Sequence, residues 1–267
     1  MTTLPETKTL QLDLSDQWLT VWLNTPENKN ALSDQLADEL RRVFEAICDD
    51  REIRGVTLRG RGGVFCAGGD LKAFKAGLTG NLTHEDAATM NRGAGELFSI
   101  IYAAPQVVVV LIEGAAIAGG LGLACCADII VASSDAKFAL TETQIGLAPA
   151  QIAPYIARRI GIPAARRIML TGARFNGDEA LRLGLVDYTG ADGSALDKIE
   201  DDLKRAVKQC APGANAATKD ILLHVDTLDP EAMVSYAANC FAECIRGNEG
   251  REGITAFIEK RKPHWAQ

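Results

Sequence analysis

The 267-residue sequence predicts an α/β fold with a strand-rich N-terminal part and a helical C-terminal part. Three observations lead to this class. Segments typical of strands alternate with helical segments along the first half of the chain. The apolar run VVVVLI at 107–112 has no polar alternation, which is typical of a parallel strand covered on both faces. From residue 150 onward the pattern is mostly helical.

In the first third, residues 17–24 and 53–60 predict two strands. Between them, Ser33 is a suitable N-cap for a helix with one apolar stripe. The second strand ends in a glycine-rich loop at 61–70. The stripe consists of Leu36, Leu40, Val43, Phe44 and Ile47.

The middle of the chain repeats this order, with a short helix expected near 119–127. We expect two domains, a core of residues 1–195 and a helical domain of residues 196–267. The strands predicted in the middle are residues 105–114, 128–133 and 137–140.

Composition and charge argue against several classes of protein. The formal net charge is −7 and no lysine or arginine run occurs, so we expect no nucleic-acid partner. The apolar runs are too short to span a bilayer, and the first residues lack a signal-peptide pattern. We therefore expect a cytoplasmic protein without a membrane partner. Seven cysteines without paired spacing and three separated histidines predict reduced cysteines and no metal site.

Two glycine-rich loops follow predicted strands. In AIAGGLGLACCAD (116–128), Gly119 and Gly120 would begin a helix, so their N–H groups would lack helical partners and lie at the positive end of the dipole. In CAGGD (66–70), Gly69 offers a similar N–H group. Two such donors that converge on one carbonyl oxygen would form an oxyanion hole.

Other interpretations of the same glycines stay open. They would equally serve tight strand-to-helix turns and close packing of the backbone. A phosphate-binding loop has less support, because GRGG at 60–63 is not followed by Gly-Lys-Ser/Thr.

The chain resembles the enoyl-CoA hydratase/isomerase (crotonase) superfamily from about residue 10 to residue 265. Six segments carry the resemblance in the family's order. They are LNTPENKNALS (23–33), FCAGGDLKAF (65–74), IEGAAIAGGLGLACCADIIVAS (112–133), KFALTETQIGLAP (137–149), LTGARFNGDEALRLGLVD (170–187) and FIEKRKPHW (257–265).

The resemblance implies a ClpP-like spiral of ββα units, with a C-terminal helical domain used in oligomerisation. It implies a homotrimer or a dimer of trimers, an acyl-CoA thioester substrate with coenzyme A as the carrier, and no permanently bound cofactor. The family's contacts with coenzyme A match Lys29, Ala67, Gly69, Asp70, Leu71 and Lys72, and in the tail Phe257 and Lys260, which can come from a neighbouring subunit.

The resemblance also implies catalytic roles. The N–H groups of Gly69 and Gly119 match the oxyanion-hole donors, and Glu142 matches a catalytic glutamate. Many hydratases of the family carry a second glutamate, and that position is Gly122 here. We expect burial to raise the pKa of Glu142 towards neutrality.

The expected reaction is hydration of a 2-enoyl-CoA. The segment TETQIGLAPAQIAPYIARRIG (141–161) resembles hydratases of branched glutaconyl-CoAs, such as 3-methylglutaconyl-CoA or isohexenylglutaconyl-CoA. Gln151, Thr143, a carboxylate from elsewhere in the pocket or the substrate's own distal carboxylate would then orient the water. Gly122 alone favours the alternative, a 3,2-enoyl-CoA isomerase with a single glutamate. A non-catalytic acyl-CoA-binding or RNA-binding protein is a distant alternative.

Overall fold

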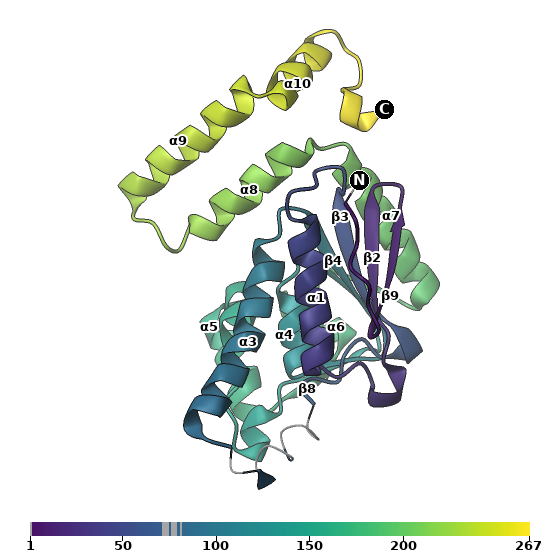
Figure 1. Cartoon of the computed structure of the whole chain (residues 1–267), viewed down its shortest axis with the longest axis vertical. Helices are drawn as coiled ribbons and strands as arrows, with labels where there is room; N and C mark the ends of the chain where they lie inside the picture. Colours follow the sequence, from purple (N-terminus) through teal and green to yellow (C-terminus); the bar gives the residue numbers. More distant parts are fainter. Residues whose placement is uncertain (1, 71–74, 76–78, 81) are drawn as a thin grey trace.

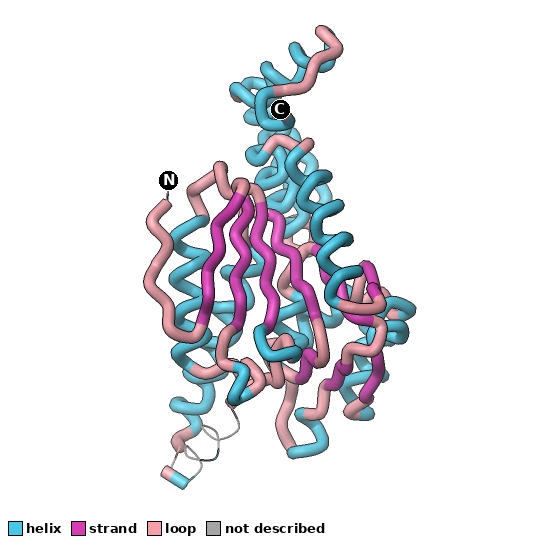
Figure 2. The backbone as a smooth tube through the Cα atoms, turned by 90° about the vertical axis from the view of Figure 1, so that its right-hand side faces the viewer, coloured by secondary structure: helices cyan, strands magenta, loops and turns pink. Residues whose placement is uncertain are grey.

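The computed structural model describes residues 2–70, 75, 79–80 and 82–267. Its centre is a sheet with the strand order β1-β2-β3-β4-β6-β9, seen in Figure 2. Strand β1 is antiparallel to β2, and the other neighbouring strands are parallel. The predicted α/β class is therefore confirmed. The strands of this sheet are β1 (Leu10–Ser15), β2 (Trp18–Leu23), β3 (Gly55–Gly60), β4 (Val107–Ile112), β6 (Ile129–Ser133) and β9 (Tyr188–Gly190).

A second, smaller sheet has the order β5-β7-β8, formed by Ala115–Ile117, Lys137–Ala139 and Arg174–Asn176. Along the chain, a strand of the large sheet is followed by a strand of the small sheet and then by a helix. This order occurs in β4-β5-α4 and, with a short turn before the helix, in β6-β7-α5. The repeated ββα unit confirms the predicted spiral, and it carries the chain from one sheet to the other beside the glycine loops.

The helices form layers around the large sheet (Figure 1). Helices α1 and α3 pack together on one side, α4 packs against α5, and α7 packs against β4, β6 and β9. Ser33 caps α1, since its side chain accepts a hydrogen bond from Leu36 N as predicted. The helices are α1 (Asp34–Ile47), α3 (His84–Ala103), α4 (Gly119–Cys125), α5 (Ala153–Thr171), α6 (Gly177–Arg182), α7 (Gly193–Lys208), α8 (Pro212–His224), α9 (Pro230–Arg246) and α10 (Asn248–Ile258).

Strand β4 is buried on both faces, which explains its unbroken apolar run. Val108, Val110 and Ile112 belong to the main core, which includes the buried side of α1. Val109 and Leu111 belong to a separate cluster under α7. Alternate residues of a strand point to opposite faces, so a strand between two apolar layers has no position for a polar side chain.

The last three helices, α8 to α10, extend away from the sheet at the top of Figure 1. Polar contacts attach them to the core. The Arg54 guanidinium donates to the carbonyl oxygens of Val207, Cys210 and Trp265. Lys219 Nζ on α8 donates to the carboxylate of Asp128 at 2.7 Å. The predicted helical C-terminal part is present, and the division into residues 1–195 and 196–267 stays a prediction.

A buried polar chain joins β2, β3 and α7. Trp18 Nε1 donates to Thr57 Oγ1 at 2.8 Å, and Thr57 Oγ1 donates to Glu200 Oε1 at 2.6 Å. Lys204 Nζ lies 2.8 Å from the same carboxylate oxygen. Each of these buried polar groups needs its partner, because an unpartnered one would keep the full cost of its lost hydration.

Replacing Thr57 should therefore show how much this buried series of hydrogen bonds stabilises the protein. We expect Thr57→Val to lower the free energy of unfolding by about 1–3 kcal/mol, because Trp18 and Glu200 each lose a partner. Thr57→Ser keeps the hydroxyl and removes one methyl group, so it should cost only about 0.8 kcal/mol. Urea denaturation of the three proteins measures both values. Equal losses in the two variants would contradict the role of the hydroxyl.

Candidate active site

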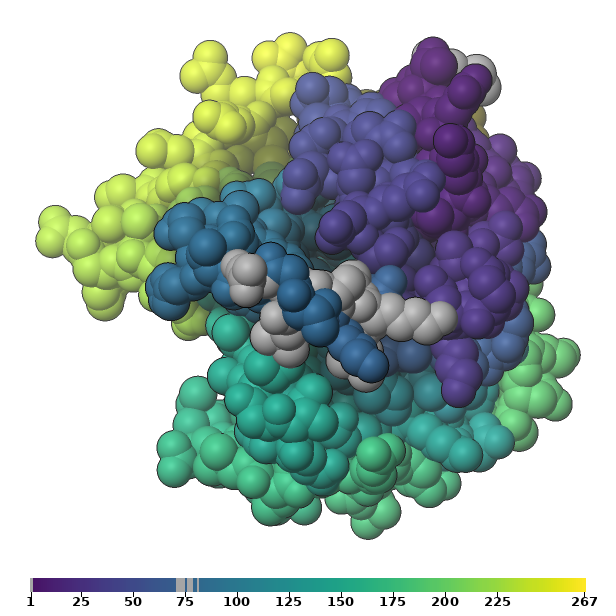
Figure 3. All heavy atoms as spheres, turned by 60° about the horizontal axis from the view of Figure 1, so that its bottom comes forward, coloured from purple at the N-terminus to yellow at the C-terminus, as the bar shows by residue number. Residues whose placement is uncertain are grey.

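Three chain segments, residues 29–32, 65–69 and 115–119, lie side by side at one end of the sheet. Leu32 N donates to Gly68 O at 2.8 Å, and Leu32 pairs with Gly69 in a parallel bridge. On the other side, Cys66 N donates to Ala115 O at 3.1 Å. Figure 3 views this end of the molecule, where the first and middle parts of the chain meet. The three segments form a short ladder that brings the two glycine loops together.

The ladder places the two predicted donor amides next to each other. A Cβ atom at Gly119 would lie only 3.5 Å from Gly69 N. Within the described part of the chain, neither the Gly69 nor the Gly119 N–H has a backbone hydrogen-bond partner. Gly119 is also the first residue of α4, where the helix dipole is positive. The two amides can therefore donate to one incoming oxygen.

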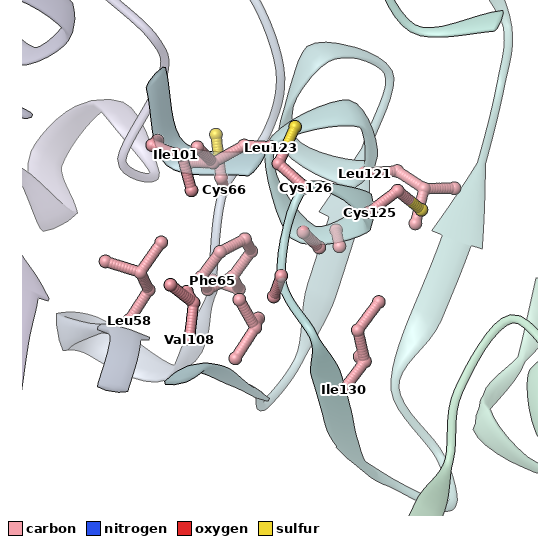
Figure 4. Packing of buried hydrophobic residues seen from close by; sticks show 14 of the residues in the cluster. Leu58, Phe65, Cys66, Ile101, Val108, Leu121, Leu123, Cys125, Cys126 and Ile130 are labelled. Carbon is pink, nitrogen blue, oxygen red and sulfur yellow. The ribbon is translucent and has the colours of Figure 1, made fainter. Parts of the chain in front are cut away.

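Two further glycines make this close approach sterically feasible. Gly68 has a φ of +98°, and a Cβ there would lie 2.9 Å from Ile117 O. A Cβ at Gly120 would lie 2.4 Å from Cys66 O. Figure 4 shows Cys66 in one apolar cluster with Leu123 of α4. Close packing, the alternative interpretation of the glycines, is thus also present, at Gly68 and Gly120.

Glu142 lies three residues after the end of β7, and the last residue of β7 is hydrogen-bonded to the N-cap residue of α4. Ala118 N, one residue before Gly119, donates to Ala139 O at 2.8 Å. Glu142 begins the 3-10 turn Glu142–Ile145. Thr143 Oγ1 and Gln144 Nε2 hold this turn against the end of α5, by hydrogen bonds to Met169 O at 3.1 Å and Gly172 O at 3.1 Å.

The Glu142 carboxyl is buried without a partner. Both of its oxygens are inaccessible to solvent, and neither makes a hydrogen bond to a described residue. Burial raises the pKa of Glu142 above its ordinary value of 4.5, as expected. An uncompensated buried carboxyl is costly, and groups of this kind are concentrated at functional sites. Its raised pKa suits proton transfer to and from carbon or water.

Gly122, the position of the family's second glutamate, faces apolar side chains. A Cβ there would lie 2.8 Å from Ile152 Cγ1 and 3.0 Å from Phe98 Cε2. No larger side chain fits without moving these groups, so the neighbourhood is built for glycine. The site therefore contains Glu142, but position 122 supplies no second carboxylate.

The structure gives Gln151 and Thr143, the two predicted water-orienting side chains, other hydrogen-bond partners. Gln151 Nε2 donates to Asn91 Oδ1 at 3.0 Å, and Thr143 donates to Met169 as described above. The hydroxyl proton of Thr143 and one N–H of the Gln151 amide are therefore already used.

The residues predicted to contact coenzyme A are distributed over two ends of the chain. Ala67 N donates to Lys29 O at 3.0 Å, which places both beside Gly69 and the partly buried Asp70. Phe257, 85% exposed, is in α10, and Lys260 lies in the turn directly after this helix, at the opposite end of Figure 1. A single chain does not bring them to the glycine loops. Leu71 and Lys72 lie outside the described residues.

The described residues contain no group of three histidine, cysteine or acidic side chains arranged to hold a metal ion. In the same part of the chain, no helix has the length and apolar character needed to cross a membrane.

Comparison with known proteins gives the family. Residues 15–267 match the family model of enoyl-CoA hydratase/isomerase, and the chain belongs to this family. The structure of Pseudomonas aeruginosa AtuE is similar, with 47% identity, a TM-score of 0.94 and coverage of 97% of this chain and 100% of that one. An enoyl-CoA hydratase/isomerase from Marinobacter aquaeolei has 38% identity and a TM-score of 0.92, with 97% and 99% coverage. Enoyl-CoA hydratase ACTT6 from Alternaria alternata is 34% identical, over 89% of this chain and 77% of that protein.

The raised pKa of Glu142 predicts how stability changes with pH. Below pH 4.5 the carboxyl is protonated in both the folded and the unfolded chain. As pH rises above this value, the unfolded chain releases the proton first, so Glu142 progressively lowers the free energy of unfolding. We expect Glu142→Gln to match the wild type in acid and to be more stable at neutral pH. Thermal unfolding across this pH range measures the difference.

Glu45→Gln makes the same chemical change at an exposed position of α1 and serves as the control. Its melting temperature should follow that of the wild type at every pH. A Glu142→Gln protein that is less stable than the wild type at neutral pH would contradict the desolvated state of the carboxyl.

Proposed function

We propose that this protein is an enoyl-CoA hydratase that adds water across the 2,3 double bond of an enoyl-CoA thioester. The single observation that carries the proposal is the buried Glu142 carboxyl, which has no hydrogen-bond partner among the described residues, in a structure where the Gly69 and Gly119 amides have no described backbone partner either. Membership in the enoyl-CoA hydratase/isomerase family supports it. Coenzyme A acts as the carrier of the substrate, bound beside Lys29, Ala67 and Asp70.

In the proposed reaction, the thioester oxygen accepts hydrogen bonds from Gly69 N and Gly119 N. Glu142, ionised, takes a proton from water while the water oxygen bonds to C3 of the substrate. The electron pair of the double bond moves to the thioester, and the two amides stabilise the resulting enolate oxygen. Protonated Glu142 then returns its proton to C2, which leaves a 3-hydroxyacyl-CoA and the starting carboxylate.

The proposed substrate is a branched glutaconyl-CoA, on the resemblance of residues 141–161 to such hydratases. Gly122 leaves the water without the family's second carboxylate, and Gln151 and Thr143 donate elsewhere. The substrate's own distal carboxylate would orient the water in place of that second carboxylate.

A second candidate is a 3,2-enoyl-CoA isomerase, and Gly122 is the observation that favours it. Isomerisation needs one group that removes a proton from C2 and returns it to C4. Glu142 alone would serve for this, with the same two amides holding the enolate.

Product analysis in D₂O separates the candidates. The protein is incubated with crotonyl-CoA, 3-hexenoyl-CoA and 3-methylglutaconyl-CoA, and the products are identified by mass spectrometry. We expect a product heavier by one water, with the fastest rate on 3-methylglutaconyl-CoA. Glu142→Gln should lose about 10²–10⁴-fold in rate, because it cannot exchange a proton. Glu45→Gln should keep the wild-type rate.

Double-bond migration without added water would establish the isomerase instead. Equal rates with crotonyl-CoA and 3-methylglutaconyl-CoA would remove the case for a substrate carboxylate. No conversion of any of the three substrates would contradict both candidates.

We also propose that the chain forms a homo-oligomer through its C-terminal helices. Val234, Phe241 and Ile245 lie on one stripe of α9 and are 71%, 66% and 42% exposed. Phe257 and Ile258 at the end of α10 are also exposed. A partner subunit would cover these side chains, and it would supply the tail residues that one chain keeps far from its own glycine loops.

Disrupting the α9 stripe tests this assembly. We expect the wild type to elute with the mass of a trimer or hexamer, and Phe241→Asp to form smaller particles, because a buried charge opposes association. Size-exclusion chromatography with light scattering measures the mass. Leu14→Asp, at an exposed apolar residue of β1, should keep the wild-type mass. A monomeric wild type would contradict the proposal.

A further inference from the structure

Asn30 is completely buried, although it lies in a polar turn. Its side chain has 0% exposure and makes three hydrogen bonds to backbone groups. Asn30 Oδ1 accepts from Thr25 N at 2.8 Å, and Nδ2 donates to Arg61 O at 2.9 Å and to Val64 O at 2.7 Å. The carboxamide thus connects the turn that precedes α1 with the start of the loop that carries Gly69.

The segment 29–32 also holds the other end of that loop. Ala67 N donates to Lys29 O at 3.0 Å, and Leu32 N donates to Gly68 O at 2.8 Å. Among the described residues, these are the backbone hydrogen bonds of Ala67 and Gly68. The position of Gly69 therefore depends on residues 29–32, and the fully buried Asn30 side chain ties this segment to residues 61–64.

The backbone at Lys29 and Asn30 has a conformation that such hydrogen bonds must hold in place. Lys29 and Asn30 both have left-handed conformations, with φ of 57° and 54°. This conformation is uncommon for residues other than glycine, and two in succession persist only where the surroundings hold them. Asn30 N also donates to Thr25 O at 3.0 Å, so both the main chain and the side chain of Asn30 close the turn.

We infer that Asn30 is a positioning residue for the oxyanion hole, an inference that rests on the proposed function. Its carboxamide holds residues 29–32 against residues 61–64, and the ladder transmits that position to the Gly69 amide. The Gly119 amide is held in place independently of Asn30, since Ala118 N donates a hydrogen bond to Ala139 O. Loss of the carboxamide would thus shift one donor relative to the other and leave Glu142 in place.

Gln106 offers a matched control in the same chain. It is 3% exposed, and its Nε2 donates to two backbone carbonyls, Ile47 O at 2.7 Å and Asp50 O at 3.1 Å. Asn30→Asp and Gln106→Glu each replace a buried carboxamide by a carboxyl of the same shape. Both should lower stability, but only Asn30 bears on the Gly69 loop. Asn30→Gly keeps the left-handed backbone without a buried charge, so it serves if Asn30→Asp does not fold.

The experiment compares kcat and KM of the wild type and these variants on the best enoyl-CoA substrate. It also compares amide hydrogen exchange of a peptide spanning residues 64–70 without ligand. We expect the Asn30 variants to lose about 10²-fold in kcat with little change in KM, because a misplaced donor acts on the transition state. Exchange in the peptide should accelerate. Gln106→Glu should keep the wild-type kcat and the wild-type exchange of this peptide.

Wild-type kcat in Asn30→Gly would overturn the inference, as would an equal loss of kcat in Gln106→Glu. If the wild type converts no enoyl-CoA, the proposed function fails, and exchange alone decides the role of Asn30. Faster exchange at residues 64–70 in Asn30→Gly then supports the role of Asn30 in positioning the Gly69 loop, and unchanged exchange overturns that role.

Discussion

The candidate site depends on one constraint, the hydrogen-bonded ladder of residues 29–32, 65–69 and 115–119. Backbone amides can serve as oxyanion donors only when two distant loops present them to one point. Here the bonds from Leu32 to Gly68 and from Cys66 to Ala115 set that approach. Close contact in turn requires glycine at Gly120, where a Cβ would meet Cys66 O at 2.4 Å. These positions therefore carry glycine, and the titratable side chain of the candidate site is Glu142.

Features with a local cause could be predicted from the sequence, and features with a distant cause could not. The burial of β4 and α1 can be recognised from their own residues, as an unbroken apolar run in β4 and an apolar stripe in α1. Strand β1 carries mostly exposed residues, and α3 buries only Leu97, Phe98 and Ile101 near its end, so neither shows a clear period. Asn30 in a polar turn looks like a surface residue, because its burial arises only when residues 61–64 dock on it. The resemblance, not any pattern, singled out Glu142.

The C-terminal helices combine polar attachment with apolar exposure. Arg54 and Lys219 bind the near end of this region to the core, and Lys219 is desolvated there, which lowers its pKa although Asp128 opposes the shift. The far end leaves Phe241 and Phe257 exposed. Hydrogen bonds thus orient the near end of this region against its own core, while large apolar side chains lie exposed at its far end.

A single carboxyl must both take and return the proton in either candidate reaction. Its pKa therefore has to lie between that of a free glutamate and that of the carbon acid, so that neither transfer is blocked. With Gly122 in place of a second acid, no neighbouring carboxylate at that position adds a like charge, and desolvation of Glu142 is the cause of the shift. Phe98 and Ile152 occupy the space into which a side chain at position 122 would extend. Hydration and isomerisation then differ in the source and destination of the proton: water and C2 in hydration, C2 and C4 in isomerisation.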